Sequence, residues 1–429
     1  MKTSYYFRFG VCILAILSPI VLSAGHAAQN PDDSTNKQSL ASIVQQVLER
    51  NPEIQAARRT VEAKKARIPQ ARAWADPRIS ISYAGNVVPP FTLMRGDPSS
   101  VRQLMGEQEI PYPGKTRLRG GIAAKEADAE TWAYEGVSRR VVSETKQAYF
   151  DLNFVEQSLS TLGKDHDLLD KIEKISEVRY AVGKAAQQDV LRAQVELSKL
   201  IDRQTLLEQM KQTLCAQLNS LRDLPVDSPV EAVPTLQPST LSYSLDDLEA
   251  AAQANFPALK QQRSMIAANN LGVDLAKKNI YPDFMLGYAF MQRSAQPAMY
   301  GITFSTTLPI FRHNKQDQAI VEAAANLESS RRMEASEMAV LRYRVKQEYL
   351  QAESAKKLLS LYKTGIVPQS SLALESSLSN YQVATTDFLM VLSNFTTVVD
   401  YELAYQEQLA NHEKALARLE ELTALELIH

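Results

Sequence analysis

The hydrophobic pattern of this chain changes period twice in each half. Residues 40–50 and 53–75 are rich in helix-forming residues, and Pro52 and Pro77 bound these segments because the residue before a proline is pushed out of the helical region. Apolar residues then occupy every second position, which predicts strands. Long stretches with helical spacing follow, so each half predicts the order helix, helix, strand, strand, helix, helix.

The predicted strands have one apolar face and one face of small or polar residues. The first strand alternates Ile79, Ile81 and Tyr83 with serines. In the second half the apolar face consists of Phe284, Leu286, Tyr288, Phe290, Tyr300, Ile302, Phe304 and Leu308. This alternation is typical of a membrane barrel strand with lipid outside and water inside. The strand before Ile110 alternates poorly, and we predict it from its place in the repeat.

Two very long helix pairs are predicted after the strands. Residues 115–181 lack proline, and a heptad seam is formed by Val141, Ala148, Val155, Leu162 and Leu169, interleaved with Thr145, Leu152, Leu159 and His166. This seam predicts a coiled coil in which His166 is a polar residue that sets the register. At about 1.5 Å per residue the helix would be roughly 100 Å long. Residues 312–381 and 387–423 repeat the helix pair, with a kink expected at Pro368.

The two halves of the chain align with each other, which indicates an internal duplication. Pro52 matches Pro257, and the offset holds without a gap through the first predicted strand. We therefore divide the chain into a first repeat at 39–224, a linker at 225–244 and a second repeat at 245–425. Each repeat carries one β-hairpin, at about 78–110 and about 283–309. The linker contains four prolines and is predicted to lie on the surface.

The N-terminus has the pattern of a secretory signal peptide. A positively charged start precedes an apolar run over residues 11–22, and small residues predict cleavage at the end of segment 1–27. Residues 28–38 are polar and predicted to be disordered. No later stretch is apolar enough for a transmembrane helix, so the exported chain would be periplasmic, secreted or an outer-membrane barrel.

Composition excludes several classes of function. The 47 basic and 49 acidic residues give a net charge of −2, so no basic excess is present to neutralise nucleic-acid phosphates. Histidines are scattered, Cys215 is the one cysteine beyond the signal segment, and no catalytic motif occurs. We therefore predict no enzyme, no metal site, no cofactor and no nucleic-acid partner.

Four strands per chain cannot close a barrel. The smallest membrane barrels have about eight strands, and open sheet edges are not tolerated in lipid. Three copies would supply twelve strands and twelve long helix passages. We therefore predict a mixed, mostly α fold: a trimeric 12-stranded β-barrel in outer-membrane lipid, continued by a coiled-coil α-helical tunnel in the periplasm.

The mature chain also resembles the TolC-like outer-membrane efflux proteins. The matching segments are residues 71–77, residues 108–115 (Gln-Glu-Ile-Pro-Tyr-Pro-Gly-Lys), residues 179–184 (Arg-Tyr-Ala-Val-Gly-Lys) and residues 189–191 (Asp-Val-Leu). The resemblance implies a homotrimeric exit duct without enzymatic activity, located in the outer membrane and extending into the periplasm. It implies a periplasmic adaptor (membrane fusion) protein and an inner-membrane pump of the RND type as partners. A type I secretion duct and a trimeric coiled-coil adhesin are the alternatives.

The resemblance also assigns docking residues at the two helix tips. These tips are where the family meets its adaptor. The matching residues are Val182, Gly183 and Lys184 at the first tip and Val383, Ala384 and Thr385 at the second. The second tip departs from the family pattern because it has alanine where glycine is usual and lacks an arginine just beyond.

A periplasmic gate is the third implication of the resemblance. Asp387 matches a carboxylate that rings the periplasmic entrance, and Met390 stands where a second carboxylate is expected. Tyr381 and Asp189 match partners in the closed-state latch. Three Asp387 carboxylates around a narrow lumen would attract cations and repel one another. Judged by its position alone, Asp387 would be an ordinary aspartate at a helix N-terminus.

Three methionines bear on the cargo, which the sequence leaves open between metal ions, drugs and polypeptides. Met285, Met291 and Met299 lie in or near the second hairpin. Thioethers are ligands for soft cations such as monovalent copper or silver, but methionine more often serves packing. The segment 188–194 resembles metal-efflux members of the family.

Overall fold

Long helices and one antiparallel sheet make up the chain in a computed structural model, which describes residues 39–85, 99–231, 233, 236–294, 296–383 and 385–428. The predicted signal peptide and the segment 28–38 lie outside the described residues. The helices of the first half are α1 (Leu40–Arg50), α2 (Pro52–Arg72), α3 (Lys115–Ala181) and α4 (Gln187–Leu221). Those of the second half are α5 (Leu245–Asn255), α6 (Pro257–Lys278), the 3₁₀ turn η1 (Arg312–Asn314), α7 (Gln316–Leu361), the π-helical turn η2 (Tyr362–Ile366), α8 (Val367–Gln382) and α9 (Phe388–Thr423). The strands are β1 (Arg78–Ala84), β2 (Val101–Ile110), β3 (Phe284–Arg293) and β4 (Met299–Thr306).

The four strands form one sheet in chain order. β1 pairs with β2, β2 with β3 and β3 with β4, all antiparallel. The register sets Ile81 opposite Leu104, Leu104 opposite Phe290, and Phe290 opposite Tyr300. Because directly opposite residues share a face, the apolar positions of all four strands lie together. Among the described strands, β1 and β4 are the edges and each has one partner.

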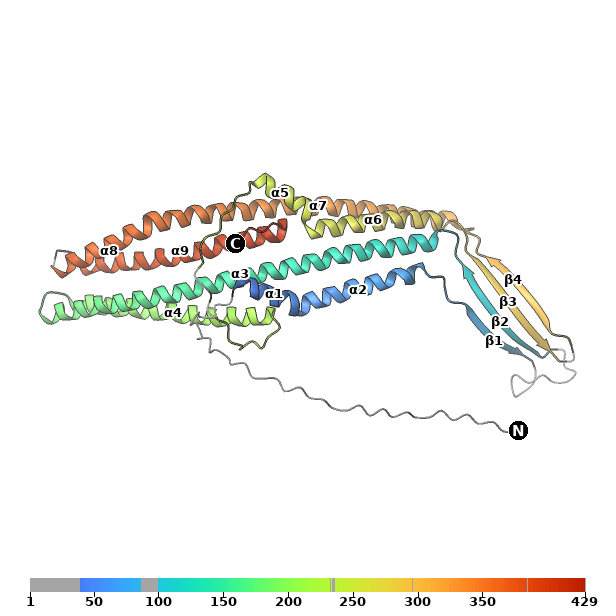
Figure 1. Cartoon of the computed structure of the whole chain (residues 1–429), viewed down its shortest axis with the longest axis horizontal. Helices are drawn as coiled ribbons and strands as arrows, with labels where there is room; N and C mark the ends of the chain where they lie inside the picture. The colour runs from blue at the N-terminus through green and yellow to red at the C-terminus, as the bar shows by residue number, and fades with distance from the viewer. Residues whose placement is uncertain are drawn as a thin grey trace, which may run out of the picture. The chain divides into compact units, whose positions relative to one another are not determined.

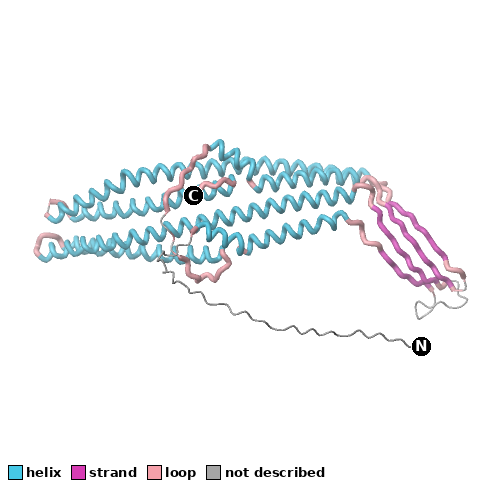
Figure 2. Tube along the Cα trace, in the orientation of Figure 1, coloured by secondary structure: helices cyan, strands magenta, loops and turns pink. Residues whose placement is uncertain are grey.

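The helix tips lie at the end of the bundle opposite the sheet (Figure 1). Loops join the helices of each pair at the tips, and further loops join the helices to the strands (Figure 2). The central helix is α3, which has 67 residues and packs against α2, α4, α6 and α9. At about 1.5 Å per residue its length is roughly 100 Å.

The predicted seam of α3 is buried. Val141, Ala148, Val155, Leu162 and Leu169 are each at most 3% exposed. His166, expected as the polar residue of this seam, is only half-buried, whereas the adjacent Asp165 is buried. The reason is that α3 buries a second face against α9, and Asp165 lies on that face near Glu402.

Matched helix starts reflect the duplication. Ser39 caps α1 by accepting a hydrogen bond from the backbone of Ser42, and Ser244 caps α5 in a capping box with Asp247. Such side chains satisfy amide groups that a helix start leaves unpaired. Both second helices begin with a proline at their first position. The helix predicted at 53–75 ends at Arg72.

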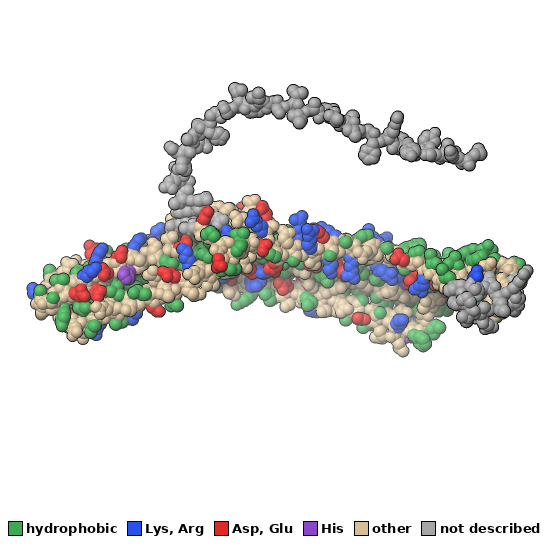
Figure 3. All heavy atoms as spheres, turned by 90° about the horizontal axis from the view of Figure 1, so that it is seen from below, with side chains coloured by type: hydrophobic (Ala, Val, Ile, Leu, Met, Phe, Trp, Pro, Cys, Tyr) green, Lys and Arg blue, Asp and Glu red, His purple; other side chains and the backbone are tan. Residues whose placement is uncertain are grey.

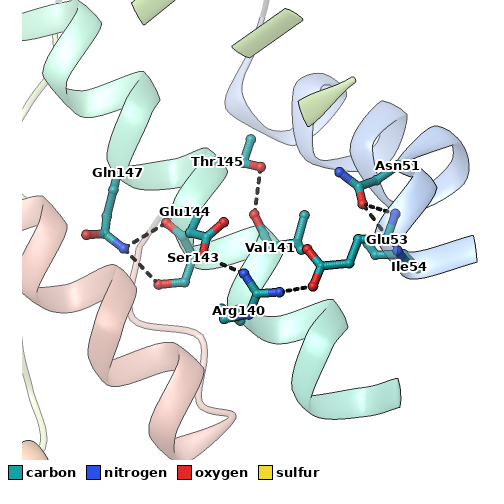
Figure 4. A network of polar contacts seen from close by, with 9 residues as sticks. All are labelled: Asn51, Glu53, Ile54, Arg140, Val141, Ser143, Glu144, Thr145 and Gln147. Atoms are coloured by element: carbon teal, nitrogen blue, oxygen red, sulfur yellow. Dashed lines mark hydrogen bonds and ion pairs between the residues drawn. The ribbon is translucent and has the colours of Figure 1, made fainter. Parts of the chain in front are cut away.

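A polar network attaches the start of α2 to α3 (Figure 4). The Arg140 guanidinium donates to Glu53 of α2 and, at 2.7 Å, to Glu144 on its own helix. The two carboxylates raise the pKa of Arg140. Asn51 caps α2 and also donates to the backbone of Leu221 at the end of α4. The start of α2 is therefore bonded to both α3 and α4.

Most described residues of the linker between the halves are exposed, in agreement with the expected surface position, but the linker is anchored at single points. Val233 is 6% exposed and belongs to the core between α1, α3 and α4. Glu413 of α9 accepts hydrogen bonds from the backbone and hydroxyl of Ser239, at 2.7 and 2.9 Å. The ring of His412 lies between the carbonyls of Ser239 and Ala352, so the linker is fastened to α9 and α7.

The interruption predicted at Pro368 is a π-helical turn. Five residues, Tyr362–Ile366, form η2 directly before α8. Proline has no amide hydrogen and clashes with the preceding turn, which a π-turn can absorb. None of the described helices combines the length and apolar character that crossing a membrane requires.

Candidate functional site

The first helix tip is closed by a glycine in the left-handed region. Gly183 has a φ of +74°, and its N–H donates to the carbonyl of Tyr180. The N–H of Lys184 donates to the carbonyl of Arg179 at 2.8 Å. These two bonds form a Schellman motif, which explains why the turn carries glycine at this position. Val182, the helix cap, is 61% exposed at the end of the tip.

The second tip repeats this closure with different residues. The N–H of Thr385 donates to the carbonyl of Asn380, and its hydroxyl donates to the same oxygen, both at 3.0 Å. The hydroxyl therefore adds a bond that the first tip does not have. Val383 caps α8 and is 69% exposed, like Val182 in the first tip. Ala384 lies outside the described residues.

Tyr381 holds the two tips together. Its side chain is 3% exposed, and its hydroxyl lies 3.4 Å from that of Ser176 on α3. The Arg179 guanidinium stacks 4.4 Å from the centre of the Tyr381 ring and donates to the Tyr381 carbonyl. A second nitrogen of Arg179 donates to the carbonyl of Lys184. Among the described contacts of Tyr381, none is a hydrogen bond to Asp189.

Arg179 is the residue of the contact between the tips that the sequence did not single out. It lies in the segment 179–184 that carries the family resemblance, but that resemblance predicted an arginine after the second tip. The structure has the guanidinium on the opposite side of the contact, on α3 before the first tip. Its position four residues before the tip glycine Gly183 is the one signal that the sequence offered.

Asp189 and Asp387 start the two return helices and lie near each other. Asp189 is in the first turn of α4 and is 9% exposed, whereas Asp387 precedes α9 and is exposed. Burial raises the pKa of Asp189, and the Asp387 carboxylate raises it further. A backbone hydrogen bond at Ala186 and two arginines act in the opposite direction.

The Asp387 side chain does not cap its own helix. Within the described part of the chain, it makes no hydrogen bond to the amides that start α9. An ordinary aspartate at this position would usually form such a bond. The carboxylate is therefore exposed and available for other partners.

A groove lies beside the tips between α4 and α9. Its volume is about 380 Å³. Leu191, Val195, Leu389 and Leu392 supply apolar lining, and Gln188, Arg192 and Glu196 supply polar lining. Leu191, Val195 and Leu389 are each at least half exposed, and together they form an exposed apolar patch in the groove.

The sheet exposes its apolar face. Ile79, Ile81, Tyr300, Ile302 and Phe304 are each at least 66% exposed. Hydrophobic side chains gather at the sheet end of the molecule, whereas charged side chains are scattered along the helices (Figure 3). An apolar patch of this kind marks a membrane or protein contact.

The junction between sheet and helices is a polar clasp. Lys115, at the start of α3, is 3% exposed and donates to Asp283 and to the carbonyl of Tyr281, both at 2.8 Å. Asp283 also accepts from the backbone of Tyr112. The rings of Tyr112 and Tyr281 stack with centres 4.6 Å apart. These contacts join the two repeats where β2 and β3 meet the helices.

No group of three or more His, Cys, Asp or Glu side chains that could hold a metal ion occurs within the described ranges. Cys215 is half-buried against the core of the first repeat, and burial raises the pKa of its thiol. This agrees with a packing role for the side chain.

Comparisons with known proteins identify the fold. Residues 43–223 match the family model of the outer membrane efflux protein. The structure is similar to VceC of Vibrio cholerae (16% identity, TM-score 0.76, covering 90% of this chain and 95% of that one) and to CmeC of Campylobacter jejuni (15%, 0.74, 94% and 93%). It is also similar to CusC (14%, 0.77, 92% and 95%). No curated protein sequence matches the chain significantly.

Proposed function

We propose that this chain, a TolC-like outer-membrane efflux protein, is the exit duct of a tripartite efflux pump and acts as a homotrimer. Its family is one of outer-membrane efflux proteins and not of enzymes. Substrates would pass from the periplasm to the outside through a 12-stranded barrel and a helical tunnel. A periplasmic adaptor and an inner-membrane pump of the RND type would complete the assembly.

The main support for this proposal is that the sheet of a single chain is open at both edges. The described sheet has two edge strands, β1 and β4, and its exposed face is apolar. Unpaired edges are too costly in lipid, so closure needs strands from other copies. Pairing of β4 in one copy with β1 in the next continues the antiparallel order, and three copies of four strands supply twelve.

Exposed apolar side chains on the helices support the same assembly. They occur on α4 at Ile201 and Leu206 and on α7 at Val321, Val340, Tyr343 and Leu350. Each is at least 46% exposed, and such residues would be buried between neighbouring copies of a helical tunnel.

The tips are the proposed adaptor-docking sites. Val182 and Val383 project at the two turns, and the groove between α4 and α9 offers an apolar floor with a charged rim. This combination fits a helical hairpin that inserts apolar side chains into the groove.

Asp387, Asp189 and Tyr381 form the proposed periplasmic gate. The exposed Asp387 carboxylate supports a charged ring at a narrow entrance, and its repulsion adds to burial in raising the pKa of Asp189. The contact of Tyr381 with Arg179 supports a latch between the two tips.

Growth inhibition of a deletion strain tests the function. The strain, with and without the restored gene, is exposed to divalent metals, monovalent copper and silver, and a panel of drugs. We expect hypersensitivity that the gene corrects, and the affected class identifies the cargo. A purified chain whose mass in detergent corresponds to one or two copies would contradict the trimer.

A further inference from the structure

Four methionines lie on the face of the sheet opposite the exposed apolar face. The register sets Met105 opposite Ala289 and Ser80, and Met291 opposite Met299 and Gln103. Met285 is opposite Ser305 on the same face. Apart from Val101, polar and small residues occupy the remaining described positions there, so packing against lipid does not explain these methionines.

Three of the four methionines are neighbours. Met291 and Met299 are a directly opposed pair, whose Cβ atoms are about 5 Å apart in an antiparallel sheet. Met105 is diagonal to Met291, at a distance of about 7 Å that long side chains can bridge. Met285 is six positions before Met291 on the same strand, roughly 20 Å away, and does not belong to this group.

Small residues leave room between the three side chains. Ala289 and Gly301 are opposite each other at the centre of the group. A Cβ added to Gly301 would lie 3.8 Å from Cε of Met291, so the end of the Met291 side chain reaches over this glycine. The three thioethers therefore surround a floor without larger side chains.

The chemistry of the group selects soft cations. Thioether sulfur is a ligand for monovalent copper and its analogue silver(I), whereas hard divalent cations prefer oxygen. Glu107 lies on the same face one row from Met105, and its side chain lies against Gly287. A nearby carboxylate raises the local concentration of cations. The side-chain amide of Gln103 donates a hydrogen bond to the sulfur of Met105 at 3.9 Å, which a bound cation would have to replace.

We propose that Met105, Met291 and Met299 form a thioether site for soft monovalent cations on the inner face of the barrel. The inference rests on the proposed function because the closed barrel makes this face the wall of the duct. Such a site would make soft monovalent cations the cargo of the duct. In the trimer, three copies of the site would line one level of the lumen.

Silver(I) binding to the purified full-length trimer in detergent tests the site. The background carries Cys215→Ala, because a thiol would bind silver by itself. We compare the double variant Met291→Leu, Met299→Leu with Met333→Leu, an exposed methionine of α7, as the matched control. Leucine keeps the apolar volume of methionine and removes only the sulfur.

We expect the double variant to lose the tightest phase of silver titration and the sulfur neighbours of silver in X-ray absorption, and the control to keep both. Circular dichroism and trimer mass check that both variants fold. Unchanged silver binding in a folded double variant overturns the site and leaves the duct standing. A parent chain that forms no trimer and restores no growth contradicts the duct instead.

Discussion

Arg179 couples the two helix tips through a single side chain. Its guanidinium stacks on Tyr381 of α8 and donates to two carbonyls. A planar guanidinium can stack and donate at once, which an amide side chain cannot do equally well.

We expect Arg179→Gln to loosen the contact between the tips and to raise the single-channel current of the trimer in lipid bilayers. Lys174→Gln, at an exposed ion pair farther back on α3, serves as control and should leave the current unchanged. Equal currents in the two variants would refute the latch.

Asp387 is a second single residue whose substitution should change the properties of the channel. The side chain is exposed and does not cap α9 in the described structure, so its charge can face a lumen. Asp387→Ala should weaken block of the single-channel current by multivalent cations. Asp202→Ala removes an exposed carboxylate of α4 and should keep the block. Unchanged block in Asp387→Ala would rule out a gate role.

Asp165 predicts a pH dependence of stability. Burial, together with the Glu402 carboxylate, raises the pKa of Asp165 to about 7, against the opposing effect of Lys164. Because the folded pKa exceeds the unfolded one, the native state binds the extra proton, and this stability is lost as the pH rises through about 7.

Asp165→Asn should therefore raise the thermal midpoint at about pH 8 and change it little at about pH 2.5, below the unfolded pKa, where the carboxyl is protonated in both states. Asp167→Asn, at an exposed position on the same helix, is the control and should have little effect at either pH. A gain that is equal at both pH values would show that titration is not the cause.

At the scale of elements, two residues of α9, His412 and Glu413, fasten the linker through Ser239. Glu413 is 1% exposed and accepts two hydrogen bonds from Ser239. Glu413→Ala leaves the Ser239 amide without its partner and should destabilise the fold by about 1–3 kcal/mol. Denaturant titration of the purified protein measures this loss. Glu407→Ala, at an exposed position of α9, should cost far less, and similar costs would show that the Glu413–Ser239 hydrogen bonds do not fasten the linker.

The two long helix pairs differ in whether the first helix of the pair is continuous. In the first half, α3 runs through 67 residues without a break, whereas α7 and α8 are separated by a π-turn before Pro368. The position of this break could be predicted from the sequence because Pro368 marks it. The type of turn depends on how the backbone redistributes its hydrogen bonds around the proline, which no residue pattern encodes.

At the scale of the whole molecule, the two faces of the sheet should respond oppositely to charge. Ile302 is 79% exposed on the apolar face, and its neighbour Thr303 lies on the other face. A lysine on a lipid-facing strand costs about 2–4 kcal/mol near the midplane, and a lumen-facing lysine costs little. Ile302→Lys should therefore reduce assembled trimer in outer-membrane fractions, and Thr303→Lys should not. Equal trimer levels would contradict the proposed barrel.

The sequence by itself determined the order of the elements. Period-two alternation predicted β1, β3 and β4, the internal repeat predicted β2, and the heptad seam and absence of proline predicted α3 at residues 115–181. The resemblance to efflux proteins agrees with the family match over residues 43–223. These features are local or repeated, so periodicity is sufficient to reveal them.

Only the tertiary structure decided which residues meet. It grouped Met105 with Met291 and Met299 and separated Met285, because strand register, and not distance along the hairpin, sets neighbours on a sheet. It also buried Asp165 in place of His166, since α3 packs on several helices at once and a single seam cannot describe all of its faces. Contacts between distant segments depend on how helices and strands pack, and that arrangement is absent from any local pattern.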